Sequence, residues 1–360
     1  NSDIQKTKLE NIRKIRKSTY RINLLGDTYF GDSYVKRTND ESLNNFLTHR
    51  TPSHSFKEIR PLLEEADFNI CMLESPIFNI ENTYLEQRLK DVRYSNEKNT
   101  PEILKQEDIN LVSLASPHIM DSDEEGLNRT LELLEAYDIY SIGAGNKQIN
   151  AEKPFVIYVN NQRYMIFNAH FYQSDNYYLF NRYAIGNESG IACLNPFIYE
   201  RMSIAKREDE TTKIIVIAHW GVKTQTKEND IRQRILAQRL SKAGADIIIG
   251  HGGRNMKGIE QINQTTVLYD IGVSIFNSDD DTRETIQHPY SLIPQVNVSP
   301  NHTIELKLYP IYTNNHATLW QPRFVDKREF NHCYTLLKKF GTLPNVSMQH
   351  DKQYYFSISL

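Results

Sequence analysis

Two carboxylates and three imidazoles each follow a short apolar run in this sequence: Asp27, Glu74, His118, His219 and His251. In open α/β folds, ligands bind at the carboxyl ends of the strands, so side chains that follow separate strands can meet at one edge. Sets of Asp, Glu and His hold divalent ions such as Mn, Zn or Fe, which polarise a phosphoryl or carbonyl oxygen and generate hydroxide. The pattern therefore indicates metal-assisted hydrolysis.

Taken one at a time, these residues have plainer explanations. Asp27 beside a glycine is typical of a turn, Glu74 is able to pair with a surface lysine, and His118 after a proline fits an ordinary loop. Their shared position at strand ends favours one common site over separate structural roles. His170 is interpreted as a satisfied or exposed histidine and not as a ligand.

Short apolar runs alternate with helical segments along most of the chain, which predicts an α/β layered fold. Helices are expected at Asp123–Tyr137, after an acidic first turn, and at Asp230–Ala243. The expected strands are Ile22–Leu25, Asn69–Leu73, Leu111–Ala115, Phe155–Val159, Tyr164–Asn168, Ile214–Ala218, Ile247–Ile249 and Val267–Ile271.

The regular alternation of strands and helices ends after Ser278. An acidic segment follows, and then expected strands around Thr303–Tyr309 and a helix at Phe330–Phe340. We therefore expect three parts. Residues 1–20 form a basic helix or linker, residues 21–278 form the main domain, and residues 279–360 complete or flank it as a small C-terminal extension.

The composition excludes several classes of protein. The chain has 360 residues, 39% hydrophobic and 24% charged, which is typical of a globular protein and excludes overall disorder. Its formal net charge of −3 makes nucleic acid an unfavoured partner. No apolar run reaches the ~20 residues that span a bilayer. Three widely spaced cysteines exclude a disulfide framework, and Cys71 is expected to be a buried thiol.

The ordered set of motifs resembles the CapA family of capsule and poly-gamma-glutamate synthesis proteins, which are relatives of the calcineurin-like metallophosphoesterases. The segments that carry the resemblance are LLGDTYFGD from Leu24, EEADFNICMLESPIF from Glu64, INLVSLASPHIMDSDEEGLNRTLELLEAYDIYSIGAG from Ile109, IIVIAHWG from Ile214, KAGADIIIGHGGRNMKGIE from Lys242 and YDIGVSIFNS from Tyr269. The resemblance implies a four-layer αββα sandwich, with metal ligands on the loops after the strands.

The resemblance also assigns roles to individual residues. Asp27 matches the aspartate of the family's Gly-Asp motif, and Glu74 the glutamate of its Asn-Leu-Glu motif. His118 matches the histidine of Asn-Asn-His, His219 that of His-Trp-Gly, and His251 the first histidine of Gly-His-His-Pro-His. The implied metal ligands are these five residues, and His118 and His219 are the implied catalytic proton carriers.

This chain departs from the family pattern at the same site. Ser116 and Pro117 replace two asparagines, Lys223 replaces a glutamate, Gly252, Gly253 and Arg254 replace His-Pro-His, and Val273 replaces an asparagine. The changes remove metal donors and add two cations, which disfavours a complete two-metal centre. Either one metal is kept, or Lys223 and Arg254 take its place and form, with Ser116, a binding site for phosphate or carboxylate.

Three functions follow as hypotheses. The first is a hydrolase acting on a phosphoester or acyl phosphate in the synthesis of an anionic polymer. The second is a non-catalytic relative that binds the polymer or a phosphorylated precursor and supports a synthetase or ligase partner. The third is a metal-dependent amidohydrolase. Family members are typically anchored outside the cell membrane by an apolar N-terminal segment, which these residues lack, so a cytoplasmic location stays open.

Overall fold

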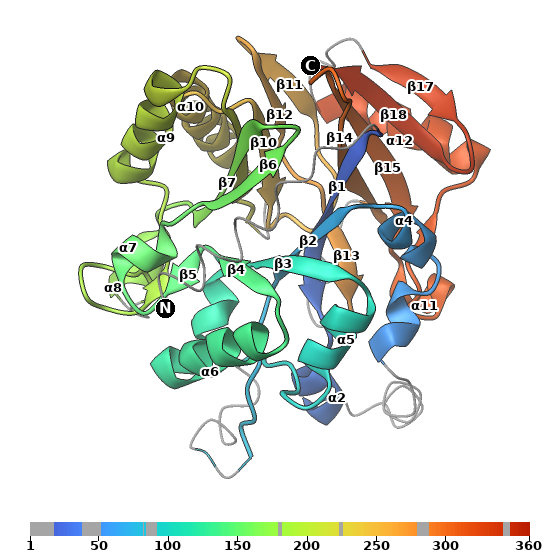
Figure 1. The fold of residues 1–360 in the computed structure, drawn as a ribbon. Helices are drawn as coiled ribbons and strands as arrows, with labels where there is room; N and C mark the ends of the chain where they lie inside the picture. The colour runs from blue at the N-terminus through green and yellow to red at the C-terminus, as the bar shows by residue number, and fades with distance from the viewer. Residues whose placement is uncertain are drawn as a thin grey trace.

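A computed structural model describes residues 18–37, 52–81, 83, 92–178, 182–222, 226–278, 288–340 and 346–360. Within these ranges the chain forms two large β-sheets with helices on their outer sides (Figure 1). Most of the predicted basic N-terminal segment, residues 1–17, lies outside the described residues. So does the acidic segment that follows Ser278.

The larger sheet has the strand order β17-β18-β15-β14-β1-β2-β3-β4, with β13 beside β1 and β16 beside β15. Strands β1 to β4 and β13 run parallel to one another, whereas β14 to β18 pair antiparallel, with β14 antiparallel to β1. The strands are β1 (Tyr20–Tyr29), β2 (Phe68–Leu73), β3 (Ile109–Ser113), β4 (Tyr140–Ile142), β13 (Val273–Phe276), β14 (Tyr290–Val298), β15 (Ile304–Tyr312), β16 (Arg323–Phe324), β17 (Ser347–His350) and β18 (Tyr354–Ser359).

The smaller sheet has the order β11-β12-β10-β9-β7-β6, and its central strands β7, β9, β10 and β12 are parallel. The strands are β6 (Phe155–Val159), β7 (Gln162–His170), β9 (Lys213–His219), β10 (Ile247–His251), β11 (Ile259–Ile262) and β12 (Thr265–Leu268). A separate short pair joins β5 (Ala144–Gly145) to β8 (Gly190–Ile191).

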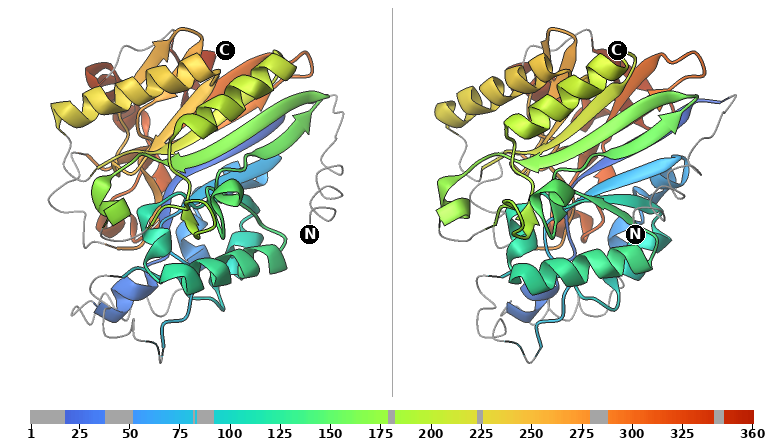
Figure 2. Two further views of the ribbon diagram at one scale, coloured as in Figure 1. Left: turned by 90° about the vertical axis from the view of Figure 1, so that its left-hand side faces the viewer. Right: turned by 60° about the vertical axis from the view of Figure 1, so that its left-hand side comes forward.

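The helices pack against the sheets or lie in the connections between strands. They are α2 (Asp32–Arg37), α4 (Arg60–Glu64), α5 (Thr100–Gln106), α6 (Asp123–Ala136), α7 (Gln148–Ala151), α8 (Ser174–Tyr178), α9 (Pro196–Glu208), α10 (Lys227–Ala243), α11 (Asn315–Thr318) and α12 (Lys327–Phe340). Helix α12 contributes Phe330, Cys333 and Leu337 to the same cluster as the core between the sheets. Two 3₁₀ turns lie at Pro52–Phe56 and Pro117–Met120. Helices α9 and α10 lie over the smaller sheet, and α6 lies on the opposite side of the molecule (Figure 2).

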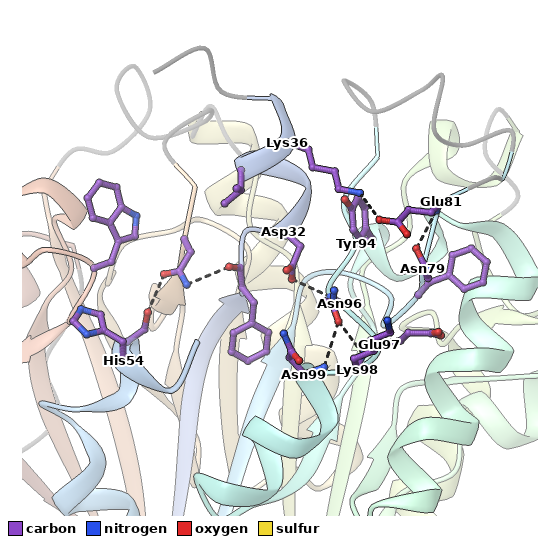
Figure 3. Close-up of a pocket in the computed structure, with 16 residues that line it drawn as sticks. Asp32, Lys36, His54, Asn79, Glu81, Tyr94, Asn96, Glu97, Lys98 and Asn99 are labelled. Atoms are coloured by element: carbon purple, nitrogen blue, oxygen red, sulfur yellow. Dashed lines mark hydrogen bonds and ion pairs between the residues drawn. The ribbon is translucent and has the colours of Figure 1, made fainter. Parts of the chain in front are cut away.

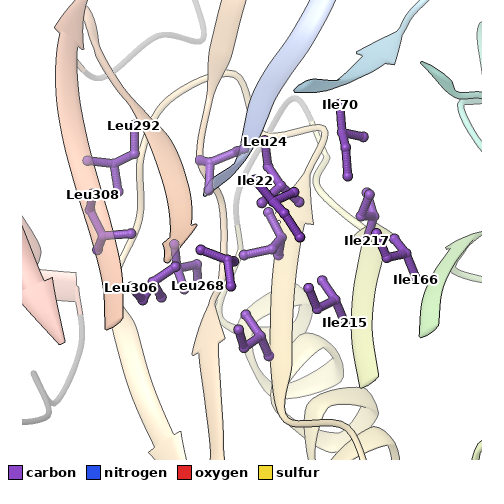
Figure 4. Close-up of a cluster of buried hydrophobic side chains, with 14 of the residues drawn as sticks. Ile22, Leu24, Ile70, Ile166, Ile215, Ile217, Leu268, Leu292, Leu306 and Leu308 are labelled. Carbon is purple, nitrogen blue, oxygen red and sulfur yellow. The ribbon is translucent and has the colours of Figure 1, made fainter. Parts of the chain in front are cut away.

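The alternation of side chains along the strands explains the order of the layers. In β9, Ile215 and Ile217 point into the core between the two sheets, where they meet Leu24 of β1 (Figure 4). The intervening Ile214 and Val216 pack on the other face, in the cluster that contains residues of α9 and α10. Both faces of β9 are therefore buried, as expected for parallel strands in a layered fold.

The predicted α/β class and the four-layer order are confirmed. Each predicted strand is present, and the three predicted helices are found as α6, α10 and α12. Several boundaries differ by two to four residues, and one of them matters for the site: the strand expected to run to Ile271 ends at Leu268, which places Asp270 after the strand. The C-terminal strand β14 pairs with β1, so this part of the chain extends the larger sheet. Among the described residues, no helix is long and apolar enough to cross a membrane.

Candidate metal centre

Three histidines lie in register at one edge of the smaller sheet. In the parallel pairing of β7, β9 and β10, His170 lies opposite His219, and His219 lies opposite His251. The larger sheet contributes Asp27, near a bulge in β1, and Glu74, directly after β2. The parallel registers therefore bring residues from distant parts of the sequence to a common edge between the two sheets.

Asp27, Glu74 and His219 form a compact cluster. One ligand atom from each of them lies within 4.8 Å of the other two. All three residues are buried, with exposed fractions of 1%, 3% and 4%. His219 Nε2 lies 2.7 Å from Glu74 Oε1. Two carboxylates and one imidazole are a donor set that suits one Zn, Mn or Fe ion, so the residues present fit the implied metal.

His251 contacts this cluster through Asp27. Its Nδ1 lies 3.0 Å from Asp27 Oδ1, and the other carboxylate oxygen accepts a hydrogen bond from the backbone N–H of Gly252 at 3.2 Å. Both oxygens of Asp27 thus have a partner, one at the end of β10 and one in the turn that follows it. The predicted role of His251 as a ligand stays a prediction, because in the structure it orients Asp27.

Arg93 is a member of the site that the sequence reasoning missed. Its Nη1 donates to Glu74 Oε2 at 3.1 Å, and the residue is only 7% exposed. Glu74 therefore holds His219 with one oxygen and Arg93 with the other. A buried carboxylate with two such partners is compensated, whereas an unpaired one would be costly.

The charges of Glu74 and His219 support each other. Burial opposes ionisation of Glu74, but His219, followed by His118 and Arg93, holds the pKa of this carboxyl well below its ordinary value. Burial also opposes charge on His219, yet Glu74, followed by Asp27 and Asp270, raises the pKa of the imidazole. Without a metal, the two side chains therefore form an ion pair.

His118 lies beside the cluster and outside the three-residue group. Its Nδ1 is 2.9 Å from Asp121 Oδ2, and its side chain is 27% exposed, against 5% for His219. Burial, and then Arg93, lowers the pKa of His118. Ser116 is fully buried and caps the 3₁₀ turn by accepting a hydrogen bond from the His118 N–H. Its predicted substrate contact stays a prediction.

His170 packs against the imidazole ring of His219. The two imidazole rings stack with centroids 5.3 Å apart, and His170 Nδ1 lies 2.9 Å from the hydroxyl of Tyr183. Burial, and then the charge of His219, holds the pKa of His170 well below its ordinary value. His170 is thus buried with its Nδ1 in a hydrogen bond, which is one of the two alternatives predicted from the sequence.

The turn after β10 contains three of the residues that depart from the expected family pattern, Gly252, Gly253 and Arg254. Gly252 and Arg254 have φ values of +99° and +66°, and Arg254 is 7% exposed with its guanidinium carbon 4.2 Å from the centroid of the Phe276 ring. Asp270 accepts hydrogen bonds from the N–H groups of Gly253 and Gly272 at 2.6 and 2.8 Å. Lys223, the second predicted cation, lies outside the described residues.

A separate pocket of about 300 Å³ opens beyond the end of β1. Figure 3 shows that the side chain of Asp32 points toward the backbone of Asn96 in its wall, where the Asn96 backbone N–H donates to Asp32 Oδ2 at 2.9 Å. Burial raises the pKa of Asp32 to about 6, against the opposing hydrogen bond from Asn96. The side chains of Lys36, His54 and Tyr94 complete a mostly polar lining.

Comparison with known families identifies the family to which this chain belongs. The model of the family described as "Bacterial capsule synthesis protein PGA_cap" matches residues 21–278. This chain belongs to that capsule synthesis family. The family resemblance inferred from the ordered motifs is thereby confirmed.

Curated relatives carry related names. "PGA biosynthesis protein CapA" of Bacillus subtilis (strain 168) is 26% identical over 263 residues, which cover 72% of this chain and 65% of the relative. "Capsule biosynthesis protein CapA" of Bacillus anthracis is 23% identical over 253 residues, with coverages of 69% and 59%. The match thus spans less than two thirds of the length of either relative.

Two solved structures are distantly similar. The first is GAP50, the anchor in the inner membrane complex of Plasmodium, at 13% identity and a TM-score of 0.40, covering 91% of this chain and 98% of that one. The second is the purple acid phosphatase PPD1 from yellow lupin (Lupinus luteus) seeds, at 15% identity and a TM-score of 0.43, with coverages of 82% and 52%.

Proposed function

We propose that this capsule-family protein hydrolyses a phosphoester or acyl phosphate during the synthesis of an anionic polymer, with one divalent ion as cofactor. The cluster of Asp27, Glu74 and His219 carries the proposal, because three strands converge to place their ligand atoms within 4.8 Å of one another. The names of the relatives, which refer to PGA and capsule biosynthesis, supply the biological setting.

Asp27, Glu74 and His219 would hold the ion directly. A divalent metal in such a site supplies Lewis-acid polarisation of a phosphoryl or carbonyl oxygen. His251 and Gly252 keep Asp27 oriented through both of its oxygens. Such supporting hydrogen bonds fix the ligands before the metal arrives.

His118 is the residue best placed to move a proton. Asp121 engages Nδ1 and fixes the ring, which leaves Nε2 as the remaining acid–base atom. Its lowered pKa keeps the imidazole neutral at pH 7, so that it is able to accept a proton. Its side chain is also more exposed than that of His219.

The non-catalytic alternative is supported by a different observation, the buried cation Arg254 in the turn whose Gly252 N–H donates to Asp27. In that case the site binds the anionic polymer or a phosphorylated precursor and supports a synthetase or ligase partner. Metal dependence separates the two functions, because anion binding by arginine requires no divalent ion.

Elemental analysis of protein purified without chelator, followed by titration with manganese, zinc and iron, is the test. We expect about one metal equivalent, lost in His219→Ala and kept in the control His332→Ala, which alters an exposed histidine of α12. Absence of bound metal under every condition would refute the enzymatic proposal. Phosphoester and amide substrates assayed with the same metal then test the reaction, and cleavage of amides alone would identify an amidohydrolase.

A further inference from the structure

The pocket beyond the end of β1 is lined by residues that the candidate metal centre does not use. Its volume is about 300 Å³, and its wall combines side chains of both charges with amides and aromatic rings. Small-molecule sites in proteins have volumes of roughly 300–1,000 Å³, so the pocket suits a small ligand. Asp27, Glu74 and His219 are not part of its wall.

Three charged side chains of the wall are already paired. Lys36 Nζ lies 3.3 Å from Glu81 Oε1, and Glu97 Oε2 accepts a hydrogen bond from Arg129 Nε at 3.0 Å. These charges compensate one another, so they do not determine which ligand the pocket prefers.

Asp32 and Lys98 carry the remaining charges of the wall. Neither of them forms an ion pair with any residue that the structure describes. A single turn connects the two, because Asp32 Oδ2 accepts the Asn96 backbone N–H at 2.9 Å and Asn96 Oδ1 accepts the Lys98 backbone N–H at 2.9 Å. Figure 3 shows the three residues along one wall. The pocket therefore presents one carboxylate and one ammonium group close together in the fold.

The environment of Asp32 favours a cationic group. Burial raises the pKa of its carboxyl to about 6, because the hydrogen bond from Asn96 offsets only part of the lost hydration. A desolvated carboxylate without a counter-charge is costly, and a ligand ammonium group that pairs with it offsets that cost. The Lys36 ammonium, 5.6 Å from the centroid of the Tyr94 ring, shows that this wall accommodates a cation against an aromatic face.

The environment of Lys98 favours an anionic group. Lys98 is exposed at the pocket, and its ammonium group donates hydrogen bonds only. The side-chain oxygen of Asn96 is used by the N–H groups of Lys98 and Asn99, at 2.9 and 3.3 Å. Among the described residues, none accepts a hydrogen bond from Asn96 Nδ2. Ammonium and amide donors of this kind bind the oxygens of a carboxylate.

Other classes of ligand match only part of this wall. A phosphate or a simple carboxylate would pair with Lys98 but would be repelled by Asp32. A simple amine would pair with Asp32 and leave Lys98 without a partner. A metal ion is not indicated, because the three converging donors found among the described residues belong to the candidate metal centre. A ligand with both an ammonium and a carboxylate group matches both unpaired charges.

We propose that this pocket binds a free amino acid, with the ammonium group at Asp32 and the carboxylate at Lys98 and Asn96. The inference goes beyond the proposed function and does not depend on a bound metal. The aromatic residues of the wall, which provide the surface for the side chain of the amino acid, are Phe30, Phe78, Tyr94 and Trp320.

Calorimetric titration of the full chain, treated with chelator, with L-leucine, L-phenylalanine and L-glutamate tests the pocket. We expect one equivalent of at least one of them to bind saturably. The two leucine analogues that lack one charge each, isoamylamine without the carboxylate and isocaproate without the ammonium group, should bind about tenfold more weakly than leucine. The corresponding pair of analogues is used if another of the three amino acids binds more tightly.

Two variants assign the groups of the ligand to the residues of the wall. Asp32→Asn should weaken binding of the amino acid and of its amine about tenfold, whereas Lys98→Gln should weaken binding of the amino acid and leave that of the amine unchanged. This crossed pattern distinguishes direct contact from a general loss of structure. Asp175→Asn and Lys105→Gln are the matched controls, because they neutralise exposed residues of α8 and α5 outside the pocket and should leave both affinities unchanged.

Circular dichroism first shows that each variant is folded. Asp32→Asn removes a desolvated charge and is therefore expected to fold. Failure of all three amino acids to bind at millimolar concentration would overturn the proposal, and so would equal affinity in the wild type and in the Asp32 and Lys98 variants. An amine that binds as tightly as its parent amino acid would overturn the assignment of Lys98 and Asn96 to the carboxylate.

Discussion

His219 Nε2 and Glu74 Oε1 lie 2.7 Å apart, although 145 positions separate the two residues in the sequence. His219 ends β9 of the smaller sheet, and Glu74 follows β2 of the larger one. Their contact therefore forms only when the two sheets pack face to face. The stability of the core and the geometry of the candidate site are linked for this reason.

Ile217→Ala tests that link. Ile217 is 1% exposed in the core between the sheets and lies two residues before His219. Its truncation should cost about 2–5 kcal/mol of unfolding free energy, through lost burial and the cavity that remains. Ile231→Ala is the control, because Ile231 is 61% exposed on α10 and should change stability by about 0.5 kcal/mol or less. Urea denaturation measures both, and equal losses would contradict the assignment of Ile217 to the core.

Much of the fold could be predicted because its strands are short apolar runs with clear ends. The same rule predicted that Asp27, Glu74, His118, His219 and His251 gather at one edge. The structure brings Asp27, Glu74, His219 and His251 into contact there, with His118 beside them and outside the three-residue group. Asp270 was missed through a boundary error: the strand that precedes it was extended across it, so the search for polar residues after strands passed over it. The signal for Asp270, a carboxylate that follows a short apolar run, was present in the sequence.

Arg93 had no comparable signal. It lies 19 positions after Glu74, outside the described strands and helices, and reaches the site through a tertiary contact with Glu74. Periodicity reports which face of an element is buried, but it does not report where an irregular segment places a long side chain. Such residues become visible only when the packed structure is known.

Asp32→Asn tests the pH dependence of stability. Burial, opposed by the Asn96 N–H, raises the pKa of Asp32 from 3.8 to about 6 in the folded protein. A raised folded pKa means that the stabilising contribution is present below pH 3.8 and is lost as the pH rises through about 6. The neutral variant should therefore gain stability relative to wild type between pH 4 and pH 7, by up to about 3 kcal/mol.

Asp209→Asn is the control for this comparison, because the pKa of Asp209 is lowered, first by hydrogen bonds from Thr211. Its contribution is present above the unfolded pKa and is lost as the pH falls, so its variant should show the opposite trend. Denaturant midpoints from pH 4 to pH 8 give both profiles. A difference between Asp32→Asn and wild type that does not change with pH would refute the assignment.

Arg254→His tests whether metal occupancy is limited by a missing donor or by the added positive charge. The family resemblance implies a histidine at this position, and the substitution introduces an imidazole while it removes the guanidinium. We expect metal occupancy to rise in Arg254→His and to rise less in Arg254→Gln, which removes the charge but adds no imidazole. Equal occupancy in the two variants, measured by elemental analysis after zinc titration, would show that the lost donor is not the limiting defect.

Gly252→Ala tests the close approach between the turn after β10 and His219. A methyl group at this position would lie 2.8 Å from His219 Cε1 and 3.1 Å from the Gly221 nitrogen, at a φ of +99°. Gly186→Ala is the matched control, because Gly186 also has a positive φ, of +59°, but faces open space.

The control should lose about 1 kcal/mol from backbone strain alone and keep its metal affinity. Gly252→Ala should lose more stability and bind zinc about tenfold more weakly, because the methyl group displaces the His219 ring from its ligand position. Zinc titration and denaturation of both variants separate the two effects, and unchanged zinc affinity in Gly252→Ala would mean that the position of His219 does not depend on this contact.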